Sequence, residues 1–214
     1  LKYKGELLWM KGRCADALEL FAQAREKTNN GITQLELDKF LNPYGKETVK
    51  TCQMLLDYGQ KEGAMKLMDL WYRLLPDNLP VREYYYLSRA NVAKTRQEME
   101  ELVEEILKRI DKENAESPAE NNDTEIYKRA LTRAWERLGY PTELAKVRTD
   151  LVYAKEMDDL EWLAERAKDC QIRKEKRAQV YKVIGDVRRK QGQTDAAFKN
   201  YQEAVRQMGT GFIR

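Results

Sequence analysis

The feature that most constrains the fold is a fixed spacing of small residues that occurs three times along the chain. Near the carboxy terminus, Gly185 is followed by Ala197, Tyr201 and Ala204 at offsets of 12, 16 and 19 residues, and Gly192 lies seven residues after Gly185. The two other sets are Gly5, Gly12, Ala17, Phe21 and Ala24, and Cys52, Gly59, Ala64, Met68 and Trp71. Three sets in one register indicate a repeated structural unit.

The spacing predicts pairs of antiparallel helices. Two helices approach closely only where the side chains at their crossing are small, so we expect Gly185 and Ala197 to face each other. Gly192 suits the left-handed residue with which a helix ends, because glycine has no Cβ to clash in that conformation. Each set therefore predicts one helical hairpin with a glycine in its turn.

This pattern resembles the tetratricopeptide repeat (TPR). The resemblance implies an all-α array of antiparallel helical hairpins, an α-solenoid, in which the first helices of the hairpins line a concave groove that binds partners. Cys52 follows Gly5 by 47 residues, whereas repeats of this family follow one another about every 34 residues. We therefore expect an array with irregular insertions.

The intervals and the local composition predict how the hairpins are distributed along the chain. We expect about three TPR-like hairpins in residues 1–112, a polar linker or mobile loop over 113–124, further TPR-like hairpins with one extra helix in 125–208, and a tail at 209–214. Thr95 and Glu98 predict a capping box at a helix start. Asp158 and Glu161 predict a similar cap for the extra helix.

The composition argues against cofactor chemistry and catalysis. The chain has three widely spaced cysteines and no histidine, so a thiolate zinc site lacks its fourth ligand and a histidine-based triad is excluded. The formal charge of +3 is near balance, and no apolar run approaches the roughly 18 residues that a membrane span needs. We expect no enzyme, cofactor, metal site or membrane span. The cysteines favour a cytoplasmic location, and Leu1 in place of an initial methionine suggests a piece of a longer protein.

The resemblance also implies which side chains face the groove. In the last hairpin its register implies Gln179, Lys182, Asp186, Arg189 and Lys190, and in the earlier hairpins it implies Gln53, Leu56 and Trp9. We add Tyr85, because three consecutive tyrosines on one helix cannot all face one core and an exposed tyrosine suits peptide binding. The alternative is that these positions are ordinary solvated or core positions.

Three functions remain open from the sequence. The first is a non-enzymatic scaffold that binds a protein or peptide, including an acidic one, and holds it in an assembly. The second is nucleic-acid binding by residues 166–190, which contain ten basic and three acidic residues, since clustered cations attract phosphates. The third is a structural oligomerisation segment of a larger protein. We favour the first, because a run of charges is usually a solvated helix face.

Overall fold

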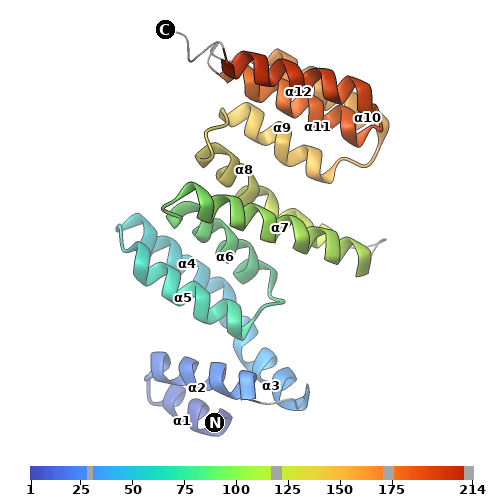
Figure 1. Cartoon of the computed structure of the whole chain (residues 1–214). Coiled ribbons are helices and arrows are strands. Elements are labelled where there is room, and N and C mark those ends of the chain that lie inside the picture. Colours follow the sequence, from blue (N-terminus) through green and yellow to red (C-terminus); the bar gives the residue numbers. More distant parts are fainter. Residues whose placement is uncertain (28–30, 117–121, 171–175, 210–214) are drawn as a thin grey trace. The chain divides into compact units, whose positions relative to one another are not determined.

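The computed structural model describes residues 1–27, 31–116, 122–170 and 176–209, and these residues form helices with no strand among them (Figure 1). The α-helices are α1 (Lys2–Met10), α2 (Cys14–Lys27), α3 (Gly31–Leu41), α4 (Gly45–Asp57), α5 (Lys61–Leu74), α6 (Leu79–Val92), α7 (Arg96–Glu116), α8 (Lys128–Arg137), α9 (Thr142–Tyr153), α10 (Met157–Asp169), α11 (Arg177–Lys190) and α12 (Thr194–Gly209). Two 3-10 helices accompany them, η1 (Asn42–Tyr44) and η2 (Asn122–Tyr127). The expected all-α fold class is confirmed.

The chain divides into two compact units. The first unit comprises Leu1–Val92 and Asn121–Ala130, and the second comprises Ala93–Glu120 and Leu131–Arg214. Helix α6 therefore belongs to the first unit and α7 to the second, although both lie in the expected amino-terminal group of hairpins. The expected division of the hairpins into residues 1–112 and 125–208 stays a prediction.

Helix covers both ends of the segment 113–124, where a polar linker or loop is expected. α7 continues to Glu116, and η2 begins at Asn122. Arg109 Nε donates to Glu113 Oε1 at 2.9 Å, and such a pair four residues apart favours continuing the helix past residue 112. Residues 117–121, in the middle of the expected linker, and most of the expected tail lie outside the described residues.

Four helical hairpins share one turn geometry. A glycine with positive φ joins α1 to α2, α4 to α5, α8 to α9 and α11 to α12: Gly12 (74°), Gly59 (76°), Gly139 (97°) and Gly192 (76°). In each turn the glycine N–H donates to the carbonyl three residues earlier, and the following N–H donates to the carbonyl five residues before it, at 2.8–3.0 Å. These bonds satisfy carbonyls that the helix end leaves unpaired. The three predicted glycine stops are confirmed.

The small residues of the pattern are buried where the helices cross. The alanines are almost inaccessible: Ala17 is 0% exposed, Ala64 0% and Ala197 3%. The glycines, however, make room for aromatic rings, whereas we expected them to face the alanines. A Cβ on Gly5 would lie 2.5 Å from the ring of Phe21, and a Cβ on Gly185 would lie 2.5 Å from the ring of Tyr201. The aromatic residue at offset 16, not the alanine at offset 12, is therefore the closest neighbour of each glycine.

Helices α8 and α9 achieve the same crossing with different side chains. Thr132 lies seven residues before Gly139, and Thr149 lies four residues after the buried Ala145. The turn is one residue longer here, because α9 begins three residues after Gly139 whereas α2 and α12 begin two residues after their turn glycines. Counted from the turn glycine for Thr132 and from the helix start for Thr149, the two threonines hold the positions of the glycine and the aromatic ring in the first and last hairpins. Thr132 Oγ1 donates to Thr149 Oγ1 at 3.0 Å, and Thr149 Oγ1 donates to the carbonyl of Ala145 at 3.0 Å. The longer turn and this polar pair explain why the spacing of small residues is not visible here in the sequence.

The capping box at the start of α7 is confirmed. The backbone N–H of Glu98 donates to Thr95 Oγ1 at 3.1 Å, and that of Thr95 donates to Glu98 Oε2 at 3.4 Å. The N–H of Lys94 donates to the same carboxylate oxygen at 2.6 Å. These backbone hydrogen bonds hold the pKa of Glu98 below its ordinary value, because they stabilise the charged form.

The expected cap of the extra helix is wrong. α10 begins at Met157, and Glu156 at its N-cap position makes no side-chain capping bond. Glu161 instead binds across to α11, where Arg188 donates to its two carboxylate oxygens at 2.5 and 3.0 Å. The partner of Glu161 is thus set by tertiary packing, which overrides the local capping preference.

Candidate functional site

A hollow beside α11 contains three of the five residues expected in the groove on that helix. This depression, the α11 hollow, measures about 400 Å³ and lies within the second compact unit. Helix α11 contributes Asp186, Arg189 and Lys190 to its lining. The other lining residues come from α7, α8 and α9 and are Leu107, Asp111, Trp135, Arg148, Leu151 and Val152. The hollow therefore combines apolar walls with charged groups of both signs.

The guanidinium of Arg148 is held against two aromatic rings at this hollow. It lies 4.0 Å from the ring centroid of Trp135 and 4.8 Å from that of Tyr140. Arg148 also donates a hydrogen bond to the hydroxyl of Tyr140. The two rings meet edge to face, with centroids 5.9 Å apart. Arg148 is therefore positioned by cation–π contacts and is not free to reach a ligand.

Asp186 is engaged by two other side chains. Its Oδ1 accepts a hydrogen bond from the hydroxyl of Tyr201 at 2.8 Å, and its Oδ2 lies 3.8 Å from Arg148 Nη2. Burial, together with the hydrogen bond and the negative charge of Asp186, raises the pKa of Tyr201 to about 12. The partners of Asp186 therefore come from α9 and α12.

Lys190 donates hydrogen bonds to the carboxy-terminal end of α9. Its Nζ donates to the carbonyl of Leu151 at 2.6 Å and to that of Val152 at 3.2 Å. Both carbonyls belong to the last turn of α9, whose unpaired carbonyls attract a cation. Burial lowers the pKa of Lys190, and the carboxylate of Asp111 partly opposes that effect. Lys190 therefore serves packing within the second unit.

Lys182 and Arg189 are the residues of the expected groove whose charge is available. Both are exposed on α11, and neither side chain makes a hydrogen bond or ion pair with a residue in the described part of the chain. They are seven residues apart, so they project from nearly the same side of the helix and are separated by about 10 Å along it. Arg189 lines the α11 hollow. Two cations on one side can thus meet the same ligand.

Gln179 fastens the start of α11 to the turn between α8 and α9. Its Nε2 donates to the carbonyl of Gly139 at 3.2 Å, and Lys176 Nζ donates to the same carbonyl at 2.8 Å. Gln179 Oε1 is buried without a hydrogen-bond partner among the described residues. The structure therefore gives Gln179 a role in holding the turn.

Three of the remaining groove candidates belong to α1 and α4 in the first unit. Gln53 is exposed and Leu56 is half-buried. Trp9 is half-buried, and its ring centroid lies 5.0 Å from that of Tyr44 and 5.9 Å from that of Phe40. Trp9 is thus packed against the apolar core of this unit, as the alternative interpretation has it.

Tyr85 packs on the preceding helix. Its ring stacks on that of Tyr72 with centroids 4.0 Å apart and an interplanar angle of 3°. Arg89 lies on the ring as well, 5.4 Å from its centroid. Tyr86, the next of the three tyrosines, is only 1% exposed. The tyrosine cluster is therefore mainly part of the joint between α5 and α6.

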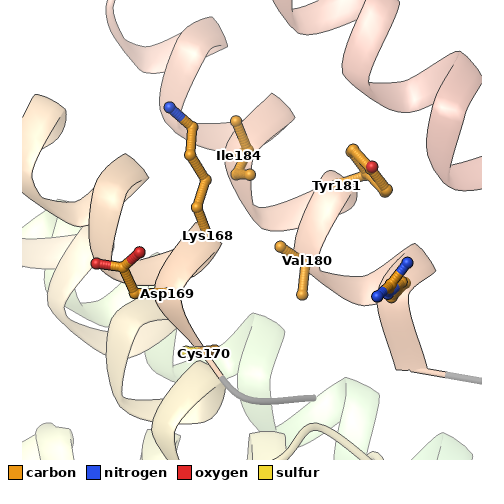
Figure 2. A pocket seen from close by; sticks show the side chains of 7 residues that line it. Lys168, Asp169, Cys170, Val180, Tyr181 and Ile184 are labelled. Carbon is orange, nitrogen blue, oxygen red and sulfur yellow. The ribbon is translucent and has the colours of Figure 1, made fainter. Parts of the chain in front are cut away.

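A second hollow lies between the end of α10 and the start of α11. It measures about 480 Å³, and Figure 2 shows Val180, Tyr181 and Ile184 of α11 across from Lys168 and Cys170 of the α10 side. Burial raises the pKa of the Cys170 thiol, which disfavours the reactive thiolate. Because this hollow adjoins residues outside the described part of the chain, we assign no ligand to it.

Sequence reasoning missed Arg148, Tyr140 and Tyr201 as neighbours of the expected groove residues. A partial signal exists for Tyr201, which is the aromatic residue at offset 16 from Gly185. Arg148 and Tyr140 follow a turn that lacks the spacing of small residues, so no repeat register could place them.

Searches of the described residues and of known proteins add few constraints. Within residues 1–27, 31–116, 122–170 and 176–209, no three side chains of the metal-binding kind come together. Over the same ranges, no helix has both the length and the apolar character needed to cross a membrane. Comparisons of the chain with family models, curated proteins and solved structures gave no match. Function is therefore inferred from the geometry of the described residues alone.

Proposed function

We propose that this chain is a TPR-like helical-repeat scaffold that binds a protein or peptide and holds it in an assembly. The observation that carries the proposal is the α11 hollow, where Arg189 stands uncompensated beside apolar walls formed by Leu107, Leu151 and Val152. A peptide with an acidic and an apolar side chain can use both features at once. The four hairpins with one turn geometry support the TPR-like part of the proposal.

We expect an acidic partner because two cations of α11 have no intramolecular partner among the described residues. On α11, Lys182 and Arg189 have no intramolecular partner among the described residues, while Asp186 is already held by Tyr201 and Arg148. The net charge offered to a ligand on this side of the helix is therefore positive. Exposed cations of this kind set specificity and association rate more than affinity, so the apolar walls must supply much of the binding energy.

The engaged cations favour a protein partner over a nucleic acid. Within 166–190, several basic side chains are already bound to other parts of the chain: Arg166 to Asp150, Lys168 to Glu165, Lys176 to Gly139, Arg188 to Glu161 and Lys190 to α9. Nucleic-acid binding depends on many cations that are free to neutralise phosphates. Four of these cations, Arg166, Lys176, Arg188 and Lys190, therefore join one element to another, and Lys168 pairs within α10.

The test starts by capturing a partner from an extract of the source cells on the immobilised chain and identifying it by mass spectrometry. The partner is then titrated against the parent chain and a Lys182→Glu/Arg189→Glu variant. We expect affinity to fall by about 1 to 3 kcal/mol, or roughly 5- to 150-fold, because two exposed attractions become repulsions. Lys190 is left unchanged, since its substitution would release the end of α9.

The matched control is Lys199→Glu on α12, an exposed lysine away from the hollow. It should bind like the parent, and circular dichroism should show unchanged helicity for both variants. Equal affinity of parent and double variant would move the site away from α11. A steep log-linear loss of binding with salt, shared by unrelated nucleic acids, would instead favour the nucleic-acid alternative.

A further inference from the structure

The lining of the α11 hollow contains a hydrogen-bond donor that has no acceptor among the described residues. Trp135 of α8 lines the hollow and is 7% exposed, and its indole Nε1 is buried without a hydrogen-bond partner in the described part of the chain. Buried polar groups are almost always hydrogen-bonded, because an unsatisfied donor destabilises the fold. A donor of this kind in the wall of a hollow therefore points to a ligand that supplies the acceptor.

The ring that carries this donor is held in place by its neighbours. The guanidinium of Arg148 lies 4.0 Å from the centroid of the Trp135 ring, and the ring of Tyr140 meets it edge to face with centroids 5.9 Å apart. Arg148 itself donates a hydrogen bond to the hydroxyl of Tyr140. The indole N–H is therefore positioned before a ligand arrives, and a preorganised donor loses less entropy when its acceptor binds.

The charges around the hollow are complementary to one negative charge. Five charged side chains line it, the cations Arg148, Arg189 and Lys190 and the carboxylates Asp111 and Asp186. Three positive and two negative charges leave a net charge of +1. Arg148 lies beside Asp186, and Asp111 acts on Lys190, so the excess charge is that of Arg189. One carboxylate balances it, whereas a phosphoryl group, with a charge of about −1.5 to −2, exceeds it.

We propose that the α11 hollow binds the carboxylate of one aspartate or glutamate side chain of the partner, which accepts hydrogen bonds from Trp135 Nε1 and from the guanidinium of Arg189. The inference rests on the proposed function, because it names the chemical group of the peptide that enters the same hollow. A carboxylate has two acceptor oxygens and can serve both donors at once. The hydrogen bond from Arg189 is charge-assisted and supplies the attraction, while the fixed N–H of Trp135 sets the position of the carboxylate.

The hollow has room for this side chain and for an apolar neighbour. Its volume of about 400 Å³ lies within the range of roughly 300 to 1,000 Å³ that is usual for ligand pockets. Leu107, Leu151 and Val152 line it as well, so an apolar residue next to the acidic one packs against them. Because Nε1 is buried in the free chain, a side chain of the wall changes rotamer when the carboxylate enters, and such changes are common on binding.

The experiment follows the indole N–H of Trp135 by NMR of the ¹⁵N-labelled chain. The chain has four tryptophans, and the signal that is missing from Trp135→Phe is that of Trp135. The probe, the glutamate peptide, is leucine–glutamate–leucine with an acetylated amino end and an amidated carboxyl end, so the side-chain carboxylate is its only charge. It is added up to about 5 mM, which detects dissociation constants of roughly 1 mM. The Trp135 signal should move downfield as the peptide binds, because a carboxylate acceptor deshields the N–H proton, while those of Trp9, Trp71 and Trp162 should stay in place.

Two further peptides and two variants test the chemistry of the contact. Leucine–glutamine–leucine lacks the charge and leucine–phosphoserine–leucine carries too much, so each should bind at least about tenfold more weakly than the glutamate peptide. Trp135→Phe keeps a ring beneath Arg148 but lacks the N–H, and it should bind the glutamate peptide about tenfold more weakly. Trp162→Phe, on an exposed residue of α10 outside the hollow, should bind like the parent. Circular dichroism should show unchanged helicity for both variants.

The outcomes separate this inference from the proposed function. A Trp135 signal that moves with none of the three peptides overturns the inference and assigns the N–H to bound water, and tighter binding of the phosphoserine peptide overturns it as well. These two readings use the parent chain, so they decide even if Trp135→Phe folds poorly. If the captured partner depends on Lys182 and Arg189 but binds Trp135→Phe as tightly as the parent, the scaffold function stands and the carboxylate contact is wrong. If the glutamate peptide shifts the Trp135 signal but no captured partner depends on Lys182 and Arg189, the carboxylate contact stands and the scaffold function is wrong.

Discussion

At the scale of single residues, the close contact between Gly185 and the ring of Tyr201 allows a direct test of how α11 and α12 cross. In Gly185→Ala, the added Cβ would lie 2.5 Å from the ring of Tyr201, with α11 and α12 packed around it. We expect the free energy of unfolding to fall by about 1 to 3 kcal/mol, the usual cost of overpacking. Urea denaturation followed by circular dichroism measures this loss.

The matched control is Gly63→Ala in α5. A Cβ on Gly63 would meet no atom within 4 Å, and its φ is not positive. Alanine should therefore stabilise the helix by about 0.5 to 1 kcal/mol, because glycine loses more backbone entropy on folding. If both substitutions change stability in the same direction, Gly185 does not mark a close crossing.

At the scale of elements, one hydrogen bond between α11 and α12 makes the last hairpin sensitive to alkali. Tyr201 donates to Asp186 in the folded chain, where its pKa is raised to about 12 from its ordinary value of 10.0. The bond therefore contributes fully to stability below pH 10 and is lost as pH rises toward 12. Urea unfolding of the parent and of Tyr201→Phe, measured from pH 8 to pH 11.5, tests this sign.

At pH 8 the Tyr201→Phe variant should be less stable by about 1 kcal/mol, the net contribution of one partly exposed hydrogen bond. That difference should shrink above pH 10, because only the parent has a phenol at position 201, and this phenol ionises more readily in the unfolded chain than in the folded one. Tyr181→Phe on α11 is the control, since Tyr181 makes no hydrogen bond with the described residues. A stability difference that stays constant up to pH 11.5 would show that folding does not raise the pKa of Tyr201.

The parts of the fold that could be predicted from sequence depend on residues close together in the chain. The glycine stops and the Thr95–Glu98 capping box involve residues within six positions of one another, so their spacing fixes their geometry. The repeat register also predicted which alanines are buried.

The candidate site could be predicted only in part, because its contacts join distant helices. Periodicity gives the side of α11 on which Lys190 lies, but its partners are carbonyls 38 and 39 residues earlier in the chain. Arg148 likewise depends on Trp135 and Asp186, which lie on two other helices. The repeat register predicts on which side of its helix a charged side chain lies. Whether that charge can still bind a ligand depends on the neighbouring helix, which can supply it with an intramolecular partner.

At the scale of the whole molecule, the candidate site belongs to one of the two compact units. Every residue that lines the α11 hollow lies within Ala93–Glu120 or Leu131–Arg214, the second unit. A ligand that binds one folded unit stabilises that unit and leaves an independent unit unchanged. The location of the site therefore predicts which helices gain stability when a ligand binds.

Hydrogen exchange followed by mass spectrometry measures this stability along the chain. With the glutamate peptide at about four times its dissociation constant, exchange from α9 and α11 should slow by up to about fivefold, because binding holds the folded second unit. Exchange from α2 and α5 of the first unit should stay as it is without peptide. The glutamine peptide at the same concentration is the control and should leave both units nearly unchanged. Equal slowing in α2 and α5 would mean that the two units open together, so that a ligand of the second unit also holds the first.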